Sequence, residues 1–220
     1  MISKILPNQI AAQQTPEQAW LWGKRLIEIH GDNVISEDGH MTRELLNLHL
    51  TILEPLSGWP IEGSGWNMKG LEKYAEQLLS GENPSGFAYT YGERLTRYPD
   101  SIDDLFLMRH IYDQKKHTNQ IEELIARLKG NPVSRRAVAT TWIPYFDPYN
   151  AEVPCLQLLD FLIRSGKLNL TAFFRSWDFT RAAPCNMYGL AKLQEHVAKE
   201  VNVPMGSLTI IAASAHIYEA

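Results

Sequence analysis

The sequence predicts an α+β fold, in which residues 1–220 form a single domain with helices flanking a mixed or antiparallel β-sheet. The chain has 220 residues, of which 45% are hydrophobic and 21% charged, and this is enough for one substantial core. No repeat or low-complexity linker divides it. Capped helical segments dominate the first half, whereas strand-like segments from Arg135 onward are expected to form one sheet.

The first helix is predicted from its N-terminal signals. Thr15 is suited to cap it, Pro16 to occupy its first turn and Gln18 to complete a capping box, and Gly31 ends it. Further along, apolar and polar residues alternate with the period of a half-buried strand. The apolar members of that run are Leu46, Leu48, Leu50 and Ile52.

Two further helices are predicted before the strand-rich part. One runs through LEKYAEQLL at 71–79 and ends near Gly81, where a loop of the GENPSG type follows. The other begins near Asn119 and places several apolar side chains on one face, which is most simply explained by core packing. These side chains are Ile121, Leu124, Ile125 and Leu128.

The C-terminal part is predicted to supply most of the sheet. Strands are expected at RRAVATTW, CLQLLDFLI, KLNLTAFFR and SLTIIAASAHIY, with a tight turn at SGK, residues 165–167. A long helix through NMYGLAKLQEHVAKEV precedes the last strand.

Composition excludes several classes of protein. The two cysteines form no CxxC pair and no disulfide framework, which indicates a reducing compartment, and we expect a cytoplasmic protein. A formal net charge of −4 with mixed signs predicts neither a nucleic-acid nor a membrane partner. Scattered histidines and the absence of HExxH, GxGxxG, P-loop and GxSxG patterns argue against a metal site and against dinucleotide, Walker-type and α/β-hydrolase sites.

Three features remain as candidates for chemistry: Cys155, the pair Arg135 and Arg136, and the polar segment FFRSWDFTRAAPCN at 173–186. Each has a simple structural explanation when taken alone. A single cysteine is usually an inert apolar residue, adjacent arginines are usually surface charges, and the polar segment could hold an ordinary ion pair. Their order and spacing change this reading.

The succession SRRAVATTW, VPCLQLLDFLI, GKLNLTAFFRSWD, PCNMYGLAKLQEHVAKEV and SAHIY resembles the thymidylate synthase family, with the short archaeal-type members most similar. Pyrimidine nucleotide hydroxymethylases are relatives within this resemblance. It covers the C-terminal half and extends back to TYGERL at 90–95, whereas the first 85 residues match weakly. The implied fold is the thymidylate synthase fold, which dimerises through the sheet.

The resemblance implies a role for each matching residue. Cys155 matches the nucleophile that adds to C6 of the pyrimidine, and Arg175 matches the arginine that lies near both this thiol and the nucleotide phosphate. The reaction needs a thiolate, so we expect positive charge to lower the pKa of Cys155. Ser176 matches a phosphate donor. Arg135 and Arg136 match the pair that reaches the phosphate held by the other subunit, which implies a homodimer with shared sites.

Other matches concern the base, the sugar and the one-carbon donor. Asn186 matches the amide that pairs with N3–H and O4 of uracil, where relatives acting on cytosine have an aspartate. His216 and Tyr218 match the pair that binds the deoxyribose 3′-hydroxyl. Asp178 matches a carboxylate that contacts the reduced pterin, and Tyr91 matches a tyrosine near C5. Each of them has a structural alternative, since a tyrosine or histidine near the end of a strand can simply be a satisfied buried polar group.

The sequence also departs from the family pattern. Leu156 follows the nucleophile where the family has a histidine that anchors a water network, so proton handling must differ. The general base is expected to be Glu76 in LEKYAEQLL, with Glu72 one turn away as the alternative and an ordinary surface glutamate as the structural explanation. Ala182 and Ala183 replace a glycine near the pterin.

The resemblance implies a thymidylate synthase that methylates dUMP to dTMP and needs no metal. Its donor would be 5,10-methylenetetrahydrofolate or 5,10-methylene-tetrahydromethanopterin. Two alternatives stay open. A hydroxymethylase would capture the same methylene intermediate with water instead of hydride, and a catalytically silent dimer would keep nucleotide binding without turnover.

Overall fold

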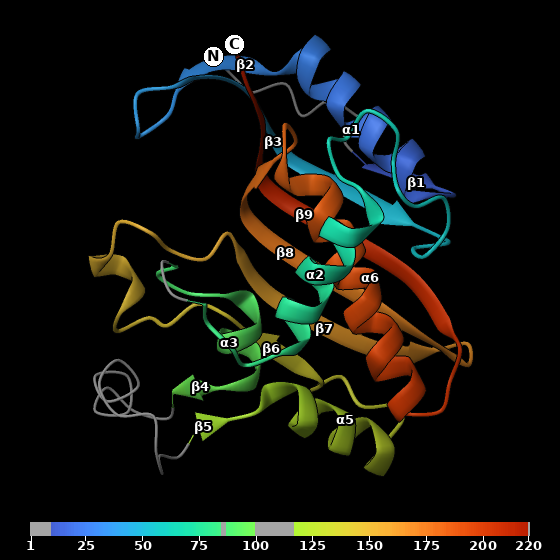
Figure 1. The fold of residues 1–220 in the computed structure, drawn as a ribbon. Coiled ribbons are helices and arrows are strands. Elements are labelled where there is room, and N and C mark those ends of the chain that lie inside the picture. Colours follow the sequence, from blue (N-terminus) through green and yellow to red (C-terminus); the bar gives the residue numbers. More distant parts are fainter. Residues whose placement is uncertain (1–9, 85–86, 100–116, 220) are drawn as a thin grey trace.

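A computed structural model describes residues 10–84, 87–99 and 117–219, and Figure 1 shows helices α2 and α6 lying across one face of its main sheet. In chain order the elements are β1 (Ile10–Gln13), α1 (Pro16–His30), β2 (Asp32–Ile35), β3 (Met41–Ile52), α2 (Met68–Leu79), α3 (Tyr91–Thr96), β4 (Tyr98–Pro99), β5 (His117–Thr118), α5 (Gln120–Gly130), β6 (Val138–Thr140), a 3-10 helix (Asp147–Tyr149), β7 (Leu156–Arg164), β8 (Lys167–Asp178), α6 (Ala182–Glu200) and β9 (Met205–Tyr218).

The main sheet has the order β1-β3-β9-β8-β7-β6, with β2 paired to β3. β7 and β8 are antiparallel and joined by the turn at Ser165 and Gly166, whereas β8 and β9 are parallel because α6 carries the chain back between them. The expected α+β class and mixed sheet are confirmed. The sheet is larger than expected, since β3 pairs antiparallel with β9 and brings β1 and β2 with it.

The predicted helix starts are confirmed by their caps. Thr15 accepts a hydrogen bond from the backbone of Gln18, and the reciprocal bond of the capping box is present. Asn119 caps α5 through its side chain, which accepts from the backbone of Ile121 and Glu122. α2 ends at Leu79, two residues before the predicted Gly81. No helix among the described residues is long and apolar enough to cross a membrane.

The alternation predicted for β3 is wrong at one position. Leu48, Leu50 and Ile52 are fully buried, but Leu46 is 49% exposed and Leu45 takes the buried place instead. Asn47 lies between Leu46 and Leu48 with a φ of 56°, and the pairing with β9 leaves it out while keeping the same register on both sides. The left-handed backbone at this residue interrupts the alternation without inserting a residue, so the buried positions on its two sides, Leu45 and Leu48, are three residues apart instead of two.

The two faces of the sheet differ in burial. On the helix-covered face Leu170, Ala172 and Phe174 of β8 are buried against the core. On the other face the side chains are half-buried or exposed, and an apolar row crosses it at Leu158, Phe173 and Ile211, which are neighbours in the register of β7, β8 and β9.

Helix α3 is held by a close approach and by a buried ion pair. A Cβ on Gly92 would overlap the carbonyl oxygens of Gln77 and Ser80, so glycine lets α3 pack on the end of α2. Arg94 donates to Asp147, the first residue of the 3-10 helix, with Nη2 2.8 Å from Oδ1, and both side chains are buried. These contacts fix the segment that carries Tyr91.

Candidate active site

Cys155 lies directly before β7, and Arg175 of the neighbouring strand β8 fixes its position. The backbone N–H of Arg175 donates to the carbonyl of Cys155 at 2.9 Å. Its guanidinium donates through Nε to the carbonyl of Pro154 and through Nη2 to that of Val153, both at 3.0 Å. Three further guanidinium N–H groups stay available for a ligand.

The pKa of the Cys155 thiol lies above its ordinary value in this structure. Burial is the largest cause and raises the pKa, the charge of Arg175 lowers it, and Asp178 raises it. The sequence predicted a lowered pKa for Cys155. Arg175 does act in the expected direction, but the desolvation of the half-buried thiol outweighs it.

Two tyrosines support the loop beside the thiol. Tyr91 accepts a hydrogen bond from the backbone N–H of Leu156 at 3.2 Å, and Tyr89 donates to the carbonyl of Val153 at 3.1 Å. Burial raises the pKa of Tyr89 to about 12 and that of Tyr91 well above its usual range, with the nearby Cys155 adding to both. Both phenols therefore keep their protons at neutral pH.

Asn186, in the first turns of α6, has its amide held from two sides. Its Oδ1 accepts from the indole Nε1 of Trp177 at 3.2 Å, and its Nδ2 donates to the hydroxyl of Tyr74 at 2.6 Å. Asn186 lines the same narrow gap as Tyr74, Tyr91 and Leu156. The base-reading candidate and the tyrosine beside the nucleophile therefore border one space.

Leu156 is buried in that gap, among apolar and aromatic side chains. Its other neighbours there are Leu78, Phe174 and Leu190. The gap has no room for a water molecule. The water network that a histidine would anchor at this position therefore has no space here. The polar groups that line the gap are the hydroxyls of Tyr74 and Tyr91 and the amide of Asn186.

A second group of predicted residues gathers where β8 and β9 end. Asp178 and His216 are register partners, and the rings of His216 and Tyr218 meet edge to face at 5.2 Å. Burial lowers the pKa of His216, so its imidazole is neutral at pH 7. Asp178 Oδ1 accepts from the backbone of Thr180 at 2.6 Å and of Arg181 at 3.3 Å, which leaves Oδ2 for a ligand.

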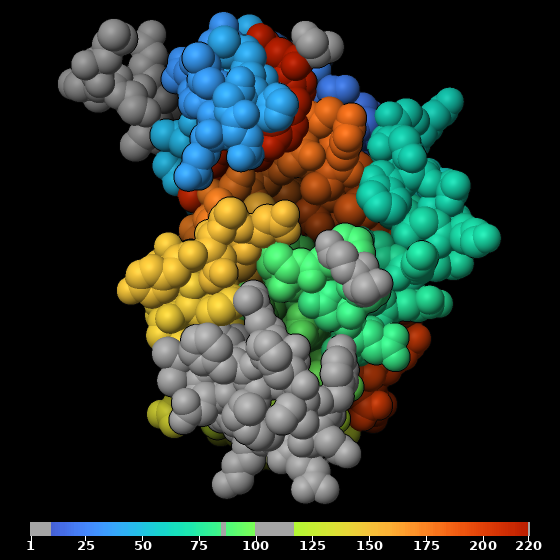
Figure 2. All heavy atoms as spheres, turned by 60° about the vertical axis from the view of Figure 1, so that its left-hand side comes forward, coloured from blue at the N-terminus to red at the C-terminus, as the bar shows by residue number. Residues whose placement is uncertain are grey.

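Figure 2 shows that the surface is hollowed over the orange segment of β8, between the blue β2–β3 region, the yellow loop before β7 and the green α3. A cleft of about 430 Å³ lies at this end of the sheet. Its lining residues are Asp38, His40, Asp178, Thr180, Arg181 and Tyr218. Cys155 lies toward this end of the sheet, because its carbonyl accepts from the backbone N–H of Arg175, three residues before Asp178 on β8. Ser176, half-buried, pairs with Ser214 in the register of the same two strands.

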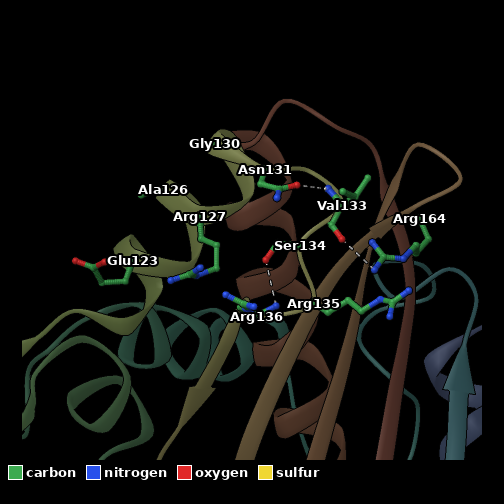
Figure 3. Close-up of a pocket in the computed structure, with 10 residues that line it drawn as sticks. All are labelled: Glu123, Ala126, Arg127, Gly130, Asn131, Val133, Ser134, Arg135, Arg136 and Arg164. Atoms are coloured by element: carbon green, nitrogen blue, oxygen red, sulfur yellow. Dashed lines mark hydrogen bonds between the residues drawn. The ribbon is translucent and has the colours of Figure 1, made fainter.

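Arg135 and Arg136 lie elsewhere. Together with Arg127 and Arg164 they line a cleft of about 840 Å³, as Figure 3 shows. In the register of β6 and β7 this cleft lies at the far end of β7 from Cys155, which corresponds to roughly 20 Å along the strand. One chain alone does not bring these arginines to its own thiol.

Glu76 is exposed on α2. It lies two residues from Tyr74, about 200° around the helix from the face that reaches Asn186. Glu72 is exposed as well. Within residues 10–84, 87–99 and 117–219, no group of three or more His, Cys, Asp or Glu side chains is placed to hold a metal ion.

Sequence reasoning missed Trp177, Tyr74 and Tyr89. Trp177 stands inside the RSWD motif, but a tryptophan in a strand is explained by core packing until its indole partner is known. Tyr74 lies on the same predicted helix as Glu76, and only the packing of α2 on α6 shows that it faces Asn186.

Comparison with known proteins identifies one family. The family model described as thymidylate synthase matches residues 62–220. A protein of Methanosarcina barkeri is 42% identical over 212 residues, covering 96% of this chain and 90% of its own length. One of Methanosarcina acetivorans is 41% identical, with coverage of 100% and 94%. One of Methanothermobacter thermautotrophicus is 42% identical, with coverage of 89% and 88%. Each is named "Putative thymidylate synthase".

Proposed function

Because the chain belongs to the thymidylate synthase family, we propose that this enzyme methylates dUMP reductively to dTMP. The observation that carries the proposal is the placement of Cys155. Arg175 and Tyr91 bond to the backbone of its two neighbours, Pro154 and Leu156, and Tyr91 borders the same gap as Asn186. The candidate nucleophile, a guanidinium and the candidate base-reading amide therefore lie close together, which supports the proposal.

In the proposed mechanism Cys155 adds to C6 of the uracil ring and C5 becomes nucleophilic. C5 then attacks the methylene carbon of the donor, and loss of the C5 proton expels the tetrahydropterin and leaves a methylene group on C5. Hydride from the tetrahydropterin reduces this group to methyl, Cys155 leaves C6, and the pterin departs in its dihydro form. The phenol of Tyr91 lies beside Cys155 and, with its raised pKa, can hydrogen-bond to groups on the ring as a donor. Glu76 faces solvent, so the free structure gives no support for proton abstraction by it.

The remaining residues are assigned to parts of the ligands. Arg175 and Ser176 bind the phosphate, Asn186 binds the uracil edge, and Asp178 contacts the reduced pterin through its open Oδ2. His216 and Tyr218 bind the 3′-hydroxyl, for which a neutral imidazole can serve as acceptor or donor. The donor is 5,10-methylenetetrahydrofolate or 5,10-methylene-tetrahydromethanopterin, and a reducing, cytoplasmic setting fits the two free cysteines.

We further propose that the enzyme acts as a homodimer formed through the outer face of the sheet. The apolar row at Leu158, Phe173 and Ile211 supports this, since it is left half-buried or exposed in one chain. The arginine cleft lies too far from Cys155 to serve it within one chain. Across a two-fold axis, Arg135 and Arg136 would instead reach the phosphate bound by the partner.

One observation keeps a second function open. The raised pKa of Cys155 leaves the thiol protonated in the free protein, as it would be in a silent nucleotide-binding dimer. The retained cysteine argues against that function, because nucleotide binding alone needs no thiol.

Covalent trapping separates these two functions. The protein is incubated with 5-fluoro-dUMP and a methylene donor, and its intact mass is measured. We expect a mass increase of nucleotide plus donor in the wild type and none in Cys155→Ser. Absence of an adduct in the wild type, or its persistence in Cys155→Ser, contradicts the assignment of Cys155 as nucleophile.

A further inference from the structure

We propose that Trp177 makes Asn186 select uracil over cytosine, because the indole N–H fixes the direction of the Asn186 amide. The inference rests on the proposed function in one respect, namely that Asn186 reads the base. Trp177 itself does not touch the nucleotide and is a positioning residue.

The position of Trp177 is set by its aromatic neighbours. It is 1% exposed, stacks on Phe174 with centroids 5.5 Å apart, and meets Phe179 edge to face at 4.6 Å. Its Nε1 points at Oδ1 of Asn186 at 3.2 Å. An indole nitrogen can donate but cannot accept, so the amide atom that faces it must be the oxygen.

The contact on the other side of the amide carries no such direction. Nδ2 of Asn186 donates to the hydroxyl of Tyr74, and Gly189 makes room for this tyrosine, since a Cβ there would lie 2.7 Å from its Cε1. A phenol hydroxyl can donate or accept by rotating. Tyr74 is therefore compatible with both orientations of the Asn186 amide, whereas Trp177 is compatible with only one.

The fixed amide matches one pyrimidine. These two hydrogen bonds leave Asn186 with one lone pair on Oδ1 and one hydrogen on Nδ2. Uracil offers the complement, since N3–H donates and O4 accepts. Cytosine offers the reverse, because its N3 accepts and its N4 amino group donates.

Binding cytosine would require the amide to turn over. Nδ2 would then face the Trp177 N–H, and two buried donors would oppose each other without an acceptor. The loss of one such buried hydrogen bond corresponds to roughly five- to a hundredfold in relative affinity. Trp177 should account for discrimination of this size.

The test compares affinities for dUMP and dCMP by calorimetry, in the wild type and in three variants. Trp177→Phe removes the directional donor. Tyr74→Phe removes the other bond to the same amide. Trp20→Phe is the matched control, because Trp20 is also a buried tryptophan, and its Nε1 donates to the carbonyl of Phe179 at 3.2 Å without contacting Asn186.

We expect the preference for dUMP to fall by roughly five- to a hundredfold in Trp177→Phe and to stay unchanged in Trp20→Phe. Tyr74→Phe should weaken both nucleotides alike and leave the ratio intact. An unchanged ratio in folded Trp177→Phe, or an equal fall in Trp20→Phe, overturns the inference.

A second replacement covers the case in which Trp177→Phe does not fold. In 3-benzothienylalanine, placed at position 177 by suppression, sulfur replaces the N–H while the ring keeps its size. A fall in the ratio of the dUMP and dCMP affinities supports the role of the Trp177 N–H, and an unchanged ratio overturns it. Formation of dTMP by the wild type is measured in parallel. If the wild type forms dTMP but its selectivity does not depend on Trp177, this inference fails while the proposed function stands; if no dTMP forms, the proposed function itself fails.

Discussion

At the scale of single residues, Cys155 shows two opposing effects on one thiol. Burial raises its pKa, and Arg175 counteracts this without overcoming it. The same arginine also donates to the carbonyls of Val153 and Pro154, so it holds the loop before Cys155 in addition to placing a positive charge near the thiol. The effect of the charge of Arg175 can be separated from its effect on the loop by replacing it with either a neutral or a charged side chain.

We expect the rate of Cys155 alkylation by iodoacetamide to rise with pH around a midpoint above that of an ordinary cysteine, because the thiolate is disfavoured. Arg175→Gln removes the charge that lowers the pKa and should move the midpoint to still higher pH, whereas Arg175→Lys should move it less. Peptide mass spectrometry follows the reaction, with Cys185, whose pKa is raised to about 12, as internal reference. A midpoint in Arg175→Gln equal to or below that of the wild type contradicts this.

Asn186→Asp should reverse the base preference. A carboxylate accepts from the N4 amino group of cytosine but repels O4 of uracil, so kcat/KM for dCMP relative to dUMP should rise by about tenfold or more. Steady-state assays with both nucleotides measure this ratio. Asn186→Ala is the control and should weaken both. Unchanged discrimination in Asn186→Asp would rule out Asn186 as the base reader.

The sequence allowed Cys155, Arg175 and Asn186 to be chosen as candidates, because their motifs are recognisable in order. It did not allow the partners of Asn186 to be chosen. Trp177 and Tyr74 meet the amide from β8 and α2, and this depends on how α2 packs on α6. A lowered pKa at Cys155 was wrongly predicted because the depth of burial is not visible in a motif.

At the scale of elements, the position of helix α3 depends strongly on one buried ion pair. It carries Tyr91 at its first position, and the buried pair of Arg94 and Asp147 ties it to the 3-10 helix. Asp147 also accepts from the backbone N–H of Ile143 at 2.7 Å. A charge left alone in this place would be strongly unfavourable.

Arg94→Met should therefore lower the free energy of unfolding by about 3–5 kcal/mol, because it leaves the buried Asp147 carboxylate without its cation. Urea unfolding followed by tryptophan fluorescence measures the change. Lys129→Met is the matched control, since Lys129 pairs with Glu200 on the surface, and its loss should cost about 1 kcal/mol or less. Equal losses in the two variants would show that the Arg94 pair has no special weight.

The elements themselves were predictable to different degrees. Caps are local, so the starts of α1 and α5 followed from Thr15 and Asn119. The change of alternation in β3 was not predictable, because it depends on the left-handed backbone at Asn47. Nor could residue patterns show that β3 lies beside β9, since strand pairing over such a separation depends on the whole sheet.

At the scale of the molecule, the two clefts lie at opposite ends of β7. One is near Cys155 and the other holds Arg135 and Arg136. A two-fold dimer through the outer face of the sheet would bring the arginine cleft of one chain to the thiol of the other. Shared sites of this kind can be tested by mixing inactive variants.

Cys155→Ser and the double variant Arg135→Gln, Arg136→Gln should each be nearly inactive. After the two are unfolded together and refolded as a mixture, half of the dimers combine them, and one site in each such dimer has both a thiol and its arginines. Activity should return to about a quarter of the wild-type value. Each variant refolded alone is the control. No recovery in mixed dimers would show that the arginines do not act across the interface.

The most direct test of the central claim is the mass of the product formed from dUMP. Purified enzyme is supplied with dUMP and each methylene-tetrahydropterin in turn, and the nucleotides are analysed by mass spectrometry. We expect dTMP, dependent on Cys155. A hydroxymethyl product would show that water captures the intermediate instead of hydride, and absence of any product with either donor would contradict the proposed synthase activity.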